Sequence, residues 1–229
     1  MRARKAFVSV RKEAAEIPQA EEYFRHVEEV INEHETRIKS HIGRHIHEAL
    51  QTQGLSLQGQ YPKFRCSFFS IELDIAKDRA VIWYGPEQEK LAQVRHNAQD
   101  IIKAVLESRH KLTYPWEEDD FLAQLKVSYK TLLPQFRSTD SLPLIDVLAQ
   151  MAFDLSRKDK RFREDPRPRY FTSYGRENFS YDLFRTRERH AYALKVATRL
   201  DTRQRSGYLW VPKSESTEGT TFASISMEI

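Results

Sequence analysis

Two seven-residue repeats of apolar side chains lie in the first half of the chain, and each is typical of a long helix. The first runs from 19 to 53, and its two series, offset by three residues, are Phe24, Ile31, Ile38 and His45, with Val27, His34 and His41. The second runs from 87 to 112, where Leu91 and Val94 begin the same kind of paired series. Gly54 stands where a left-handed C-cap would end the first helix. The sequence therefore predicts two long helices, each with one apolar seam.

The stretch between these helices has the two-residue alternation of strands. In "KFRCSFFSIELDI" apolar and polar residues alternate, and "AVIWYG" repeats the alternation after the turn "AKDR". We expect a β-hairpin over 63–84, ended by Pro86. Two helices that flank one hairpin pack most simply as an antiparallel pair, seam to seam. Residues 1–18 are expected to form an extension with a short strand at "FVSV", and Pro18 is expected to open the first helix.

The second half predicts three helices followed by two strands. Amphipathic periodicity indicates helices over 117–133, 141–155 and 176–200, the last turning to strand near Tyr192, and 157–175 has the composition of a charged loop. "GYLWVPK" and "TTFASISMEI" have the composition of strands, and "SESTEG" joins them. Helix, helix, helix, strand, strand is the element order of a winged helix-turn-helix, in which the third helix carries the recognition residues.

Together these patterns predict an α+β chain that is mostly helical and has two domains. Residues 1–113 would form the antiparallel helix pair with its inserted β-hairpin, suited to assembly with other proteins. Residues 114–229 would form a basic, winged-helix-like domain. The length of 229 residues and a hydrophobic share of 40% are sufficient for two small cores.

Composition narrows the class of protein further. The single cysteine, Cys66, excludes an intrachain disulfide and a multi-cysteine zinc site. No apolar run approaches the length needed to cross a bilayer, and the first residues lack the apolar core of a secretory signal. We therefore expect a cytoplasmic protein that has no membrane partner.

The net charge of +4 hides a strong local excess of positive charge. Residues 157–205 hold 15 Lys and Arg against 7 Asp and Glu, a net charge of +8, so the rest of the chain is net acidic. Such a segment is typical of a surface that binds a polyanion. The nucleic-acid-binding residues predicted from it are Arg161, Arg163, Arg167, Arg169, Arg176, Arg185, Arg187, Arg189, Lys195 and Arg199.

These residues predict a non-enzymatic nucleic-acid-binding protein that works as an accessory subunit of a multi-protein complex. Arginines would neutralise phosphates, and aromatic residues between them, such as Tyr170 and Phe171, would stack on unpaired bases. DNA is favoured over RNA as the partner. The helical pair would bind a protein partner or a second copy of the chain, and no cofactor is expected.

Two histidines of the predicted first helix are candidate metal ligands. His41 and His45 are spaced i, i+4, so both would face one point, as two zinc ligands do. A third ligand would have to come from elsewhere, because Glu48 lies outside the pair and no HExxH motif is present. A seam in which His34, His41 and His45 act as polar spacers explains the pattern more simply. We therefore predict no metal site.

Two alternative functions stay open. In "RTRERH", Arg185 and His190 have an R-x4-H spacing that resembles that of HEPN-class ribonucleases, although Thr186 stands where that family has another polar residue. The resemblance implies that the arginine stabilises a phosphorane while the imidazole moves a proton. The other alternative is a pure interaction subunit whose basic segment binds an acidic protein. No GxxxxGK[ST] or GxSxG motif supports an NTPase or a serine hydrolase.

Overall fold

The computed structural model describes residues 2–13, 20–114, 116–136 and 141–228. Within these ranges the fold is α+β, with two sheets. The chain divides into two compact units. The first contains Met1–Trp83 and Lys90–Leu106, and the second contains Tyr84–Glu89 and Glu107–Ile229. In the described ranges no helix is long and apolar enough to cross a membrane.

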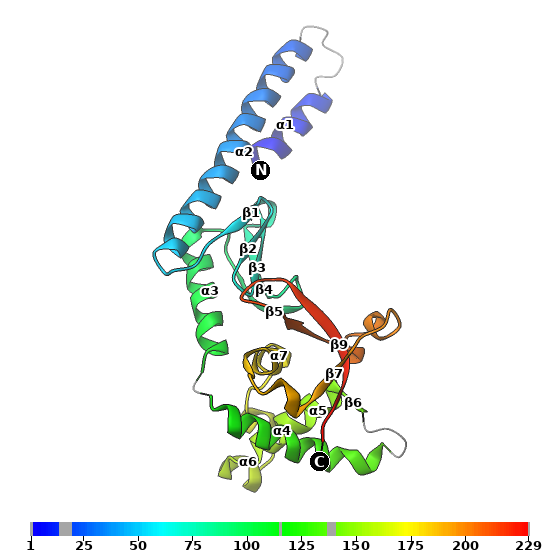
Figure 1. Ribbon diagram of the computed structural model, residues 1–229. Coiled ribbons are helices and arrows are strands. Elements are labelled where there is room, and N and C mark those ends of the chain that lie inside the picture. Colours follow the sequence, from blue (N-terminus) through cyan, green and yellow to red (C-terminus); the bar gives the residue numbers. More distant parts are fainter. Residues whose placement is uncertain (1, 14–19, 115, 137–140, 229) are drawn as a thin grey trace. The chain divides into compact units, whose positions relative to one another are not determined.

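The first unit combines a helical hairpin with a five-stranded sheet in which neighbours in sequence are neighbours in space (Figure 1). The helices are α1 (Arg2–Glu13), α2 (Ala20–Gln51) and α3 (Ala98–Leu112), the last of which continues into the second unit. The strands are β1 (Gln58–Gln60), β2 (Lys63–Cys66), β3 (Phe69–Asp74), β4 (Arg79–Tyr84) and β5 (Glu89–Val94). A Cβ added at Gly43 would lie 3.3 Å from the Phe64 ring, so the C-terminal half of α2 packs closely on β2.

The predicted first helix is present. The two-stranded hairpin predicted over 63–84 is instead three strands, β2 to β4, because the chain turns at Ser67, which has a φ of 51°, and pairs β2 with β3. Two further local predictions for this unit are wrong. α2 matches the helix predicted over 19–53, and Gly54 has the left-handed φ of 70° expected after it. The strand at "FVSV" is instead part of α1, because Phe7 packs on Phe24 of α2, with ring centroids 5.7 Å apart. Tertiary packing of this kind overrides the strand preference of valine. Pro18 lies outside the described residues.

The helix predicted over 87–112 begins only at Ala98. Residues 89–94 instead form β5, which pairs with β4. This pairing gives hydrogen-bond partners to backbone groups of β4 that would otherwise lie at the edge of the sheet. The Asn97 side chain accepts a hydrogen bond from the backbone N–H of Asp100 at 2.8 Å, which is the contact expected of a helix N-cap. The heptad spacing of Leu91 and Val94 therefore arises in a strand, and the predicted antiparallel pair of two long helices is not formed as drawn from the sequence.

The second unit has helices packed against a small antiparallel sheet. Its helices are α4 (Glu118–Leu132), α5 (Leu144–Ser156), α6 (Lys160–Glu164) and α7 (Arg176–Arg185), and its strands are β6 (Ser141–Pro143), β7 (Ala193–Val196), β8 (Leu209–Pro212) and β9 (Gly219–Ser226). β9 pairs with β6, β7 and β8. The hairpin predicted from "GYLWVPK" and "TTFASISMEI" is confirmed, with Leu209 opposite Phe222.

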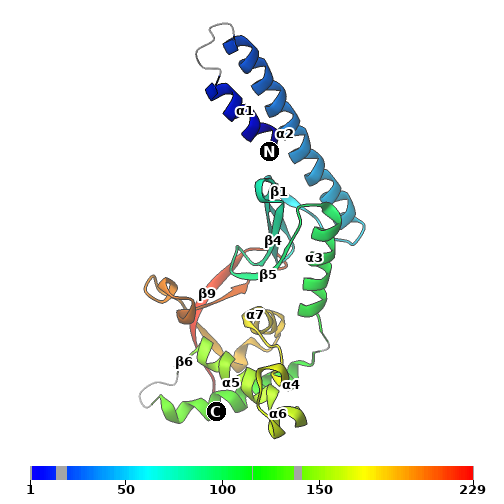
Figure 2. The same ribbon diagram turned by 180° about the vertical axis from the view of Figure 1, so that it is seen from behind.

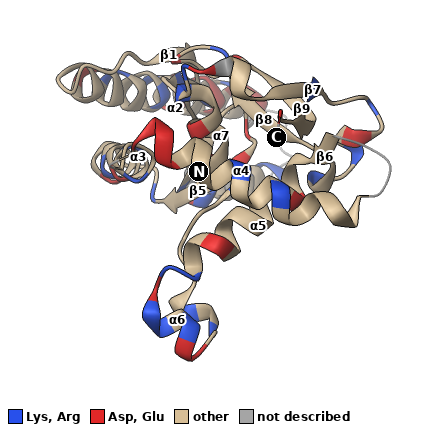
Figure 3. Ribbon diagram, turned by 60° about the horizontal axis from the view of Figure 1, so that its bottom comes forward, with Lys and Arg blue, Asp and Glu red and all other residues tan. Residues whose placement is uncertain are grey.

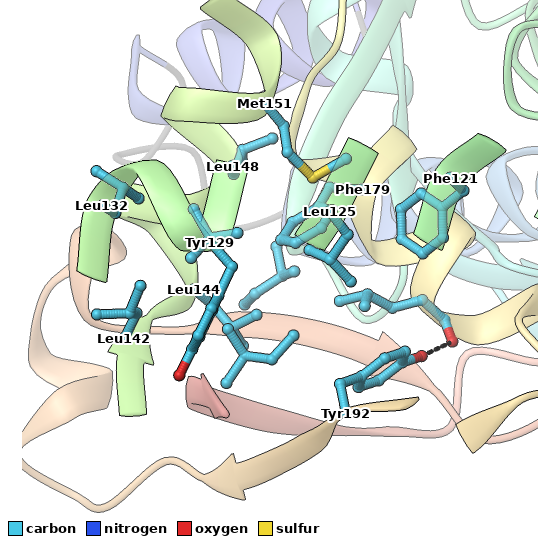
Figure 4. Close-up of a cluster of buried hydrophobic side chains, with 14 of the residues drawn as sticks. Phe121, Leu125, Tyr129, Leu132, Leu142, Leu144, Leu148, Met151, Phe179 and Tyr192 are labelled. Atoms are coloured by element: carbon cyan, nitrogen blue, oxygen red, sulfur yellow. Dashed lines mark hydrogen bonds between the residues drawn. The ribbon is translucent and has the colours of Figure 1, made fainter. Parts of the chain in front are cut away.

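One buried apolar cluster holds these elements together (Figure 4). α4 contributes Phe121, Leu125 and Tyr129, and α5 and α7 contribute Met151 and Phe179. The hydroxyl of Tyr192, next to β7, donates a hydrogen bond to the Leu183 carbonyl oxygen at 3.0 Å (Figure 4). The cluster therefore fixes α7 between the other helices and the sheet.

The third helix of this unit is much shorter than predicted. The sequence predicts this helix over 176–200, with a change to strand near Tyr192. α7 ends at Arg185, Thr186 has an extended backbone, and the strand is present as β7. The Thr186 hydroxyl donates to the Asp182 carbonyl oxygen at 2.7 Å. The Glu118 carboxylate accepts the next two backbone N–H groups, those of Arg187 and Glu188, at 2.6 and 2.8 Å. These contacts satisfy backbone donors outside the helix and so favour its end there.

The turn at Gly85 lies close to the Trp210 ring, and a substitution there can test the packing of this unit. Gly85 has a φ of 63°, and an added Cβ would lie 2.8 Å from the Trp210 ring. Gly85→Ala should lower the free energy of unfolding by about 3 kcal/mol, since backbone strain and overpacking add. Gly54→Ala is the matched control, because it has a similar φ but no atom within 4 Å of the added Cβ, and should cost about 1 kcal/mol. Equal shifts in urea denaturation would contradict the predicted packing effect.

Candidate nucleic-acid interface

The predicted basic residues fall in different structural surroundings. Four of them, Arg161, Arg163, Arg167 and Arg169, lie on the segment 157–172, which contains α6 and is here named the basic lobe. Arg176 and Arg185 are the first and last residues of α7. Arg187, Lys195 and Arg199 are exposed on segments that follow α7. The side chain of Arg189 lies outside the described part of the structure.

The basic lobe is a closed loop on a small apolar base. Phe162 of α6 is buried and packs edge-on against the rings of Phe153 and Phe171, with centroids 5.9 and 4.7 Å away. The Ser156 hydroxyl accepts the backbone N–H of Thr172 at 3.0 Å, which joins the two ends of the loop. The charged loop predicted over 157–175 is therefore partly helical and is anchored at its base. Anchoring of this kind reduces the entropy lost when a surface binds a ligand.

The cations of the basic lobe are all exposed. They are Arg157, Lys158, Lys160, Arg161, Arg163, Arg167 and Arg169. In Figure 3, α6 projects beyond α5 and carries a concentration of basic residues. Three carboxylates oppose the seven cations: Asp159 pairs with Arg161 at 2.8 Å, Glu164 with Lys160 at 3.6 Å, and Asp165 with Arg167 at 2.9 Å. The hydrogen bonds from Arg161 hold the pKa of Asp159 below its ordinary value.

Three cations and two aromatic rings of this region remain available to a ligand. In the described part of the chain, Arg157, Lys158 and Arg163 make no ion pair. Phe153 and Phe171 are 42% and 48% exposed, although each also contacts Phe162 and the Arg157 guanidinium carbon lies 5.9 Å from the centroid of the Phe153 ring. A surface that combines unpaired cations with exposed rings can contact both phosphates and bases.

Arg176, by contrast, has a structural role. Its guanidinium contacts the Glu89 carboxylate at 2.5 Å and the carbonyl oxygens of Arg205 and Tyr208 at 2.7 and 2.6 Å. The side chain is 17% exposed, and the Tyr208 ring lies 5.6 Å from the guanidinium carbon. All three nitrogens are thus engaged within the unit, and three of the five N–H groups are used there.

Arg185 also has partners within the unit. It donates two hydrogen bonds to Asp182, at 2.6 and 3.0 Å. Its guanidinium carbon lies 4.1 Å from the centroid of the Trp116 ring, 4.9 Å from that of Tyr114 and 5.1 Å from that of Tyr181. Three cation–π contacts and a carboxylate hold the side chain in place.

Asp182 is the centre of this cluster. It is 1% exposed, and besides Arg185 its carboxylate accepts the hydroxyls of Tyr114 and Tyr174 at 2.8 and 2.7 Å. Burial raises the pKa of Asp182, and the hydrogen bonds from Tyr174 and Arg185 oppose that rise. Burial and the nearby negative charge of Asp182 raise the pKa of both tyrosines. A buried carboxylate with this many donors is typical of a structural network.

These contacts argue against α7 as a recognition helix. Every residue of α7 is buried or half-buried. A helix that reads a DNA groove needs an exposed face with free side chains. The predicted cluster of arginines along a long third helix is therefore wrong in its geometry. The basic lobe and the connection 197–208 after β7 lie at separate places of the unit in both ribbon views (Figures 1 and 2).

The ribonuclease alternative depended on Arg185 and His190 sharing one helix. Arg185 ends α7, whereas His190 belongs to a 3-10 turn, Arg189–Ala191. The guanidinium of Arg185 is also held by Asp182, as described above. The helical premise of that spacing is therefore wrong.

His34, Ile38, His41 and His45 of α2 are exposed, so this part of the predicted seam does not pack within the described chain, whereas Phe24 of the same seam is buried. The His41 and His45 rings are neighbours, with centroids 4.1 Å apart. Within the described ranges, no group of three His, Cys, Asp or Glu residues could hold a metal ion.

Comparisons with known protein families, with curated proteins and with solved structures find no match to this chain. Its function must therefore be argued from its own surfaces. Arg157, Lys158 and Lys160, which are not among the binding residues predicted above, belong to the same basic lobe as Arg161 and to the same charged segment of the sequence, "RKDKRFRED".

Proposed function

We propose that this chain is a non-enzymatic nucleic-acid-binding subunit that contacts its partner through the basic lobe. The observation that carries the proposal is the lobe itself: seven exposed cations against three carboxylates, on an anchored loop that carries the exposed Phe171 and lies beside the exposed Phe153 of α5. Cations at this density neutralise phosphates and release counterions, which is the main source of affinity for nucleic acids.

The topology of the second unit supports DNA as the partner. Its order is α4, β6, α5, α6, α7, β7, β8, β9, and β9 lies between β6 and β7 in the sheet. We propose a winged-helix-like arrangement for this unit, since that fold also places its last strand between two earlier ones. Because α7 is buried, the proposed contact uses the basic lobe in place of the third helix. Phosphate contacts would then dominate over base contacts, and sequence preference would be weak.

The test is the salt dependence of binding, measured by fluorescence anisotropy with a labelled 20-base-pair DNA duplex. The logarithm of the association constant should fall with the logarithm of salt concentration with a slope of about −3 or steeper, because at least three unpaired cations are available. The matched RNA duplex and the single strands measure the preference for DNA. No binding at about 50 mM salt would refute the proposal and favour an acidic protein partner instead.

Incubation of the same RNA strand with the protein tests the enzyme alternative in parallel. The proposal expects intact RNA. Cleavage that is lost in His190→Ala would refute a purely non-enzymatic role and support the ribonuclease alternative.

A further inference from the structure

The helical hairpin of α1 and α2 carries an unusual share of exposed apolar side chains. Among the described residues, ten large hydrophobic side chains are exposed, and five belong to this hairpin: Val8, Val10, Tyr23, Val30 and Ile38. Tyr23 is 68% exposed and Ile38 48%. Single exposed apolar residues need no explanation, but several on one element mark an interaction surface.

Three of these residues belong to a continuous stripe along α2. The stripe is Tyr23, Val27, Val30, His34, Ile38, His41 and His45. Successive members are four, three, four, four, three and four residues apart, so they share one face of the helix. Val27 is half-buried, and all the others are exposed.

The stripe is distinct from the faces of α2 that are already covered. α1 contacts α2 through Phe7 on Phe24 and through the ion pair of Arg11 with Glu28 at 3.0 Å. The buried residues Ile46 and Leu50 occupy a further face. The stripe therefore stays open with α1 and the sheet in place.

The charges of α2 indicate what covers the stripe. Residues 20–35 hold six Glu and one Arg, whereas residues 36–51 hold two Arg and one Lys against one Glu. The first half of the helix is thus net −5 and the second half net +2. α1, which packs on the first half, has a net charge of +4, with Arg11 paired to Glu28, so this half of the hairpin is net acidic by one charge, against +2 on the second half. Two copies packed side by side in opposite directions bring each acidic half against a basic half, whereas a parallel pair places the two acidic halves together. Opposite charges across a helix interface set its orientation.

We propose that the partner of this stripe is a second copy of the same chain, bound antiparallel, with the two-fold axis near His34. In this arrangement Val30 of each copy lies close to the segment of the partner that carries Ile38 and His41. The helix of 32 residues is about 48 Å long, which is enough for three heptads of contact. The dimer is independent of nucleic-acid binding, and it would place two basic lobes in one particle.

Sedimentation equilibrium of the full chain tests the dimer. The wild type should be dimeric at micromolar concentration. Val30→Glu combined with Ile38→Glu should weaken the dimer by about a hundredfold or more, because each change buries an unpaired charge at the interface. Circular dichroism should be unchanged, since both residues are exposed in the single chain. Val127→Glu, at a side chain of α4 that is 56% exposed, is the matched control and should leave the dimer intact.

Cysteine crosslinking tests the orientation, in a Cys66→Ser background. Under mild oxidation His34→Cys should form a disulfide-linked dimer by itself. Tyr23→Cys and His45→Cys should each crosslink poorly alone but readily when the two proteins are mixed. Efficient crosslinking of each alone would overturn the antiparallel arrangement and indicate a parallel one. A chain that is monomeric at all concentrations would overturn the dimer itself.

Discussion

Replacing Asp182 with alanine should lower the free energy of unfolding by about 3–5 kcal/mol, because it removes one partner from a buried ionic network. The carboxylate is 1% exposed and accepts hydrogen bonds from Arg185, Tyr114 and Tyr174. Without it, a half-buried guanidinium and two tyrosine hydroxyls lose their acceptor together, and each unpaired donor adds its own desolvation cost.

Urea denaturation followed by tryptophan fluorescence measures this loss, and Asp119→Ala provides the matched control. Asp119 is an exposed carboxylate in the first turn of α4. Its removal should cost only a few tenths of a kcal/mol, through the helix dipole. If Asp182→Ala unfolds at the same urea concentration as the control, the network contributes nothing to stability.

Charge reversal at Arg185 should act through the same network. Arg185→Glu would place a second carboxylate beside Asp182 and between three aromatic rings. We expect a large loss of stability, so any accompanying loss of nucleic-acid binding would reflect unfolding. Arg187, which is exposed, is the better position for a surface test.

The elements that the sequence predicts well are those in which the spacing of apolar side chains depends only on the geometry of the element itself. The helical period of α2 and the alternation of exposed and buried residues in β2 follow from which side chains face the core along one element. Where the sequence prediction fails, a contact with another element decides the outcome. β5 forms because β4 is beside it, and α7 ends where Glu118, about seventy residues earlier, accepts the next backbone N–H groups.

The same limit applies to the basic residues of the candidate site. A run of charges predicts a positive surface, and the basic lobe is one. The sequence does not show that Arg176 meets Glu89, which is 87 positions earlier, or that Arg185 stacks on Trp116. The sequence therefore does not distinguish an arginine that is free to bind a ligand from one that has a structural role. The carboxylate and carbonyl partners seen in the structure make that distinction.

The second large expected effect is a loss of affinity for DNA when cations of the basic lobe are removed. Replacing Arg157, Lys158 and Arg163 together with glutamine should weaken binding to duplex DNA by about a hundredfold at 0.1 M salt. The salt slope should become shallower by about 3, since each lost phosphate contact removes about 0.9. These three side chains are exposed and make no ion pair in the described part of the chain, so the fold should tolerate the change.

The matched control removes the same charge from another surface of the same unit. Lys195, Arg199 and Arg203 are exposed on β7 and on the turn that follows it. Replacing all three with glutamine lowers the net charge equally, so it measures the general attraction of a basic protein for DNA. We expect a small change in affinity and little change in slope. The opposite ranking, with the control losing more, would move the interface from the basic lobe to the strands around β9, where the wing of the proposed fold would contact the duplex.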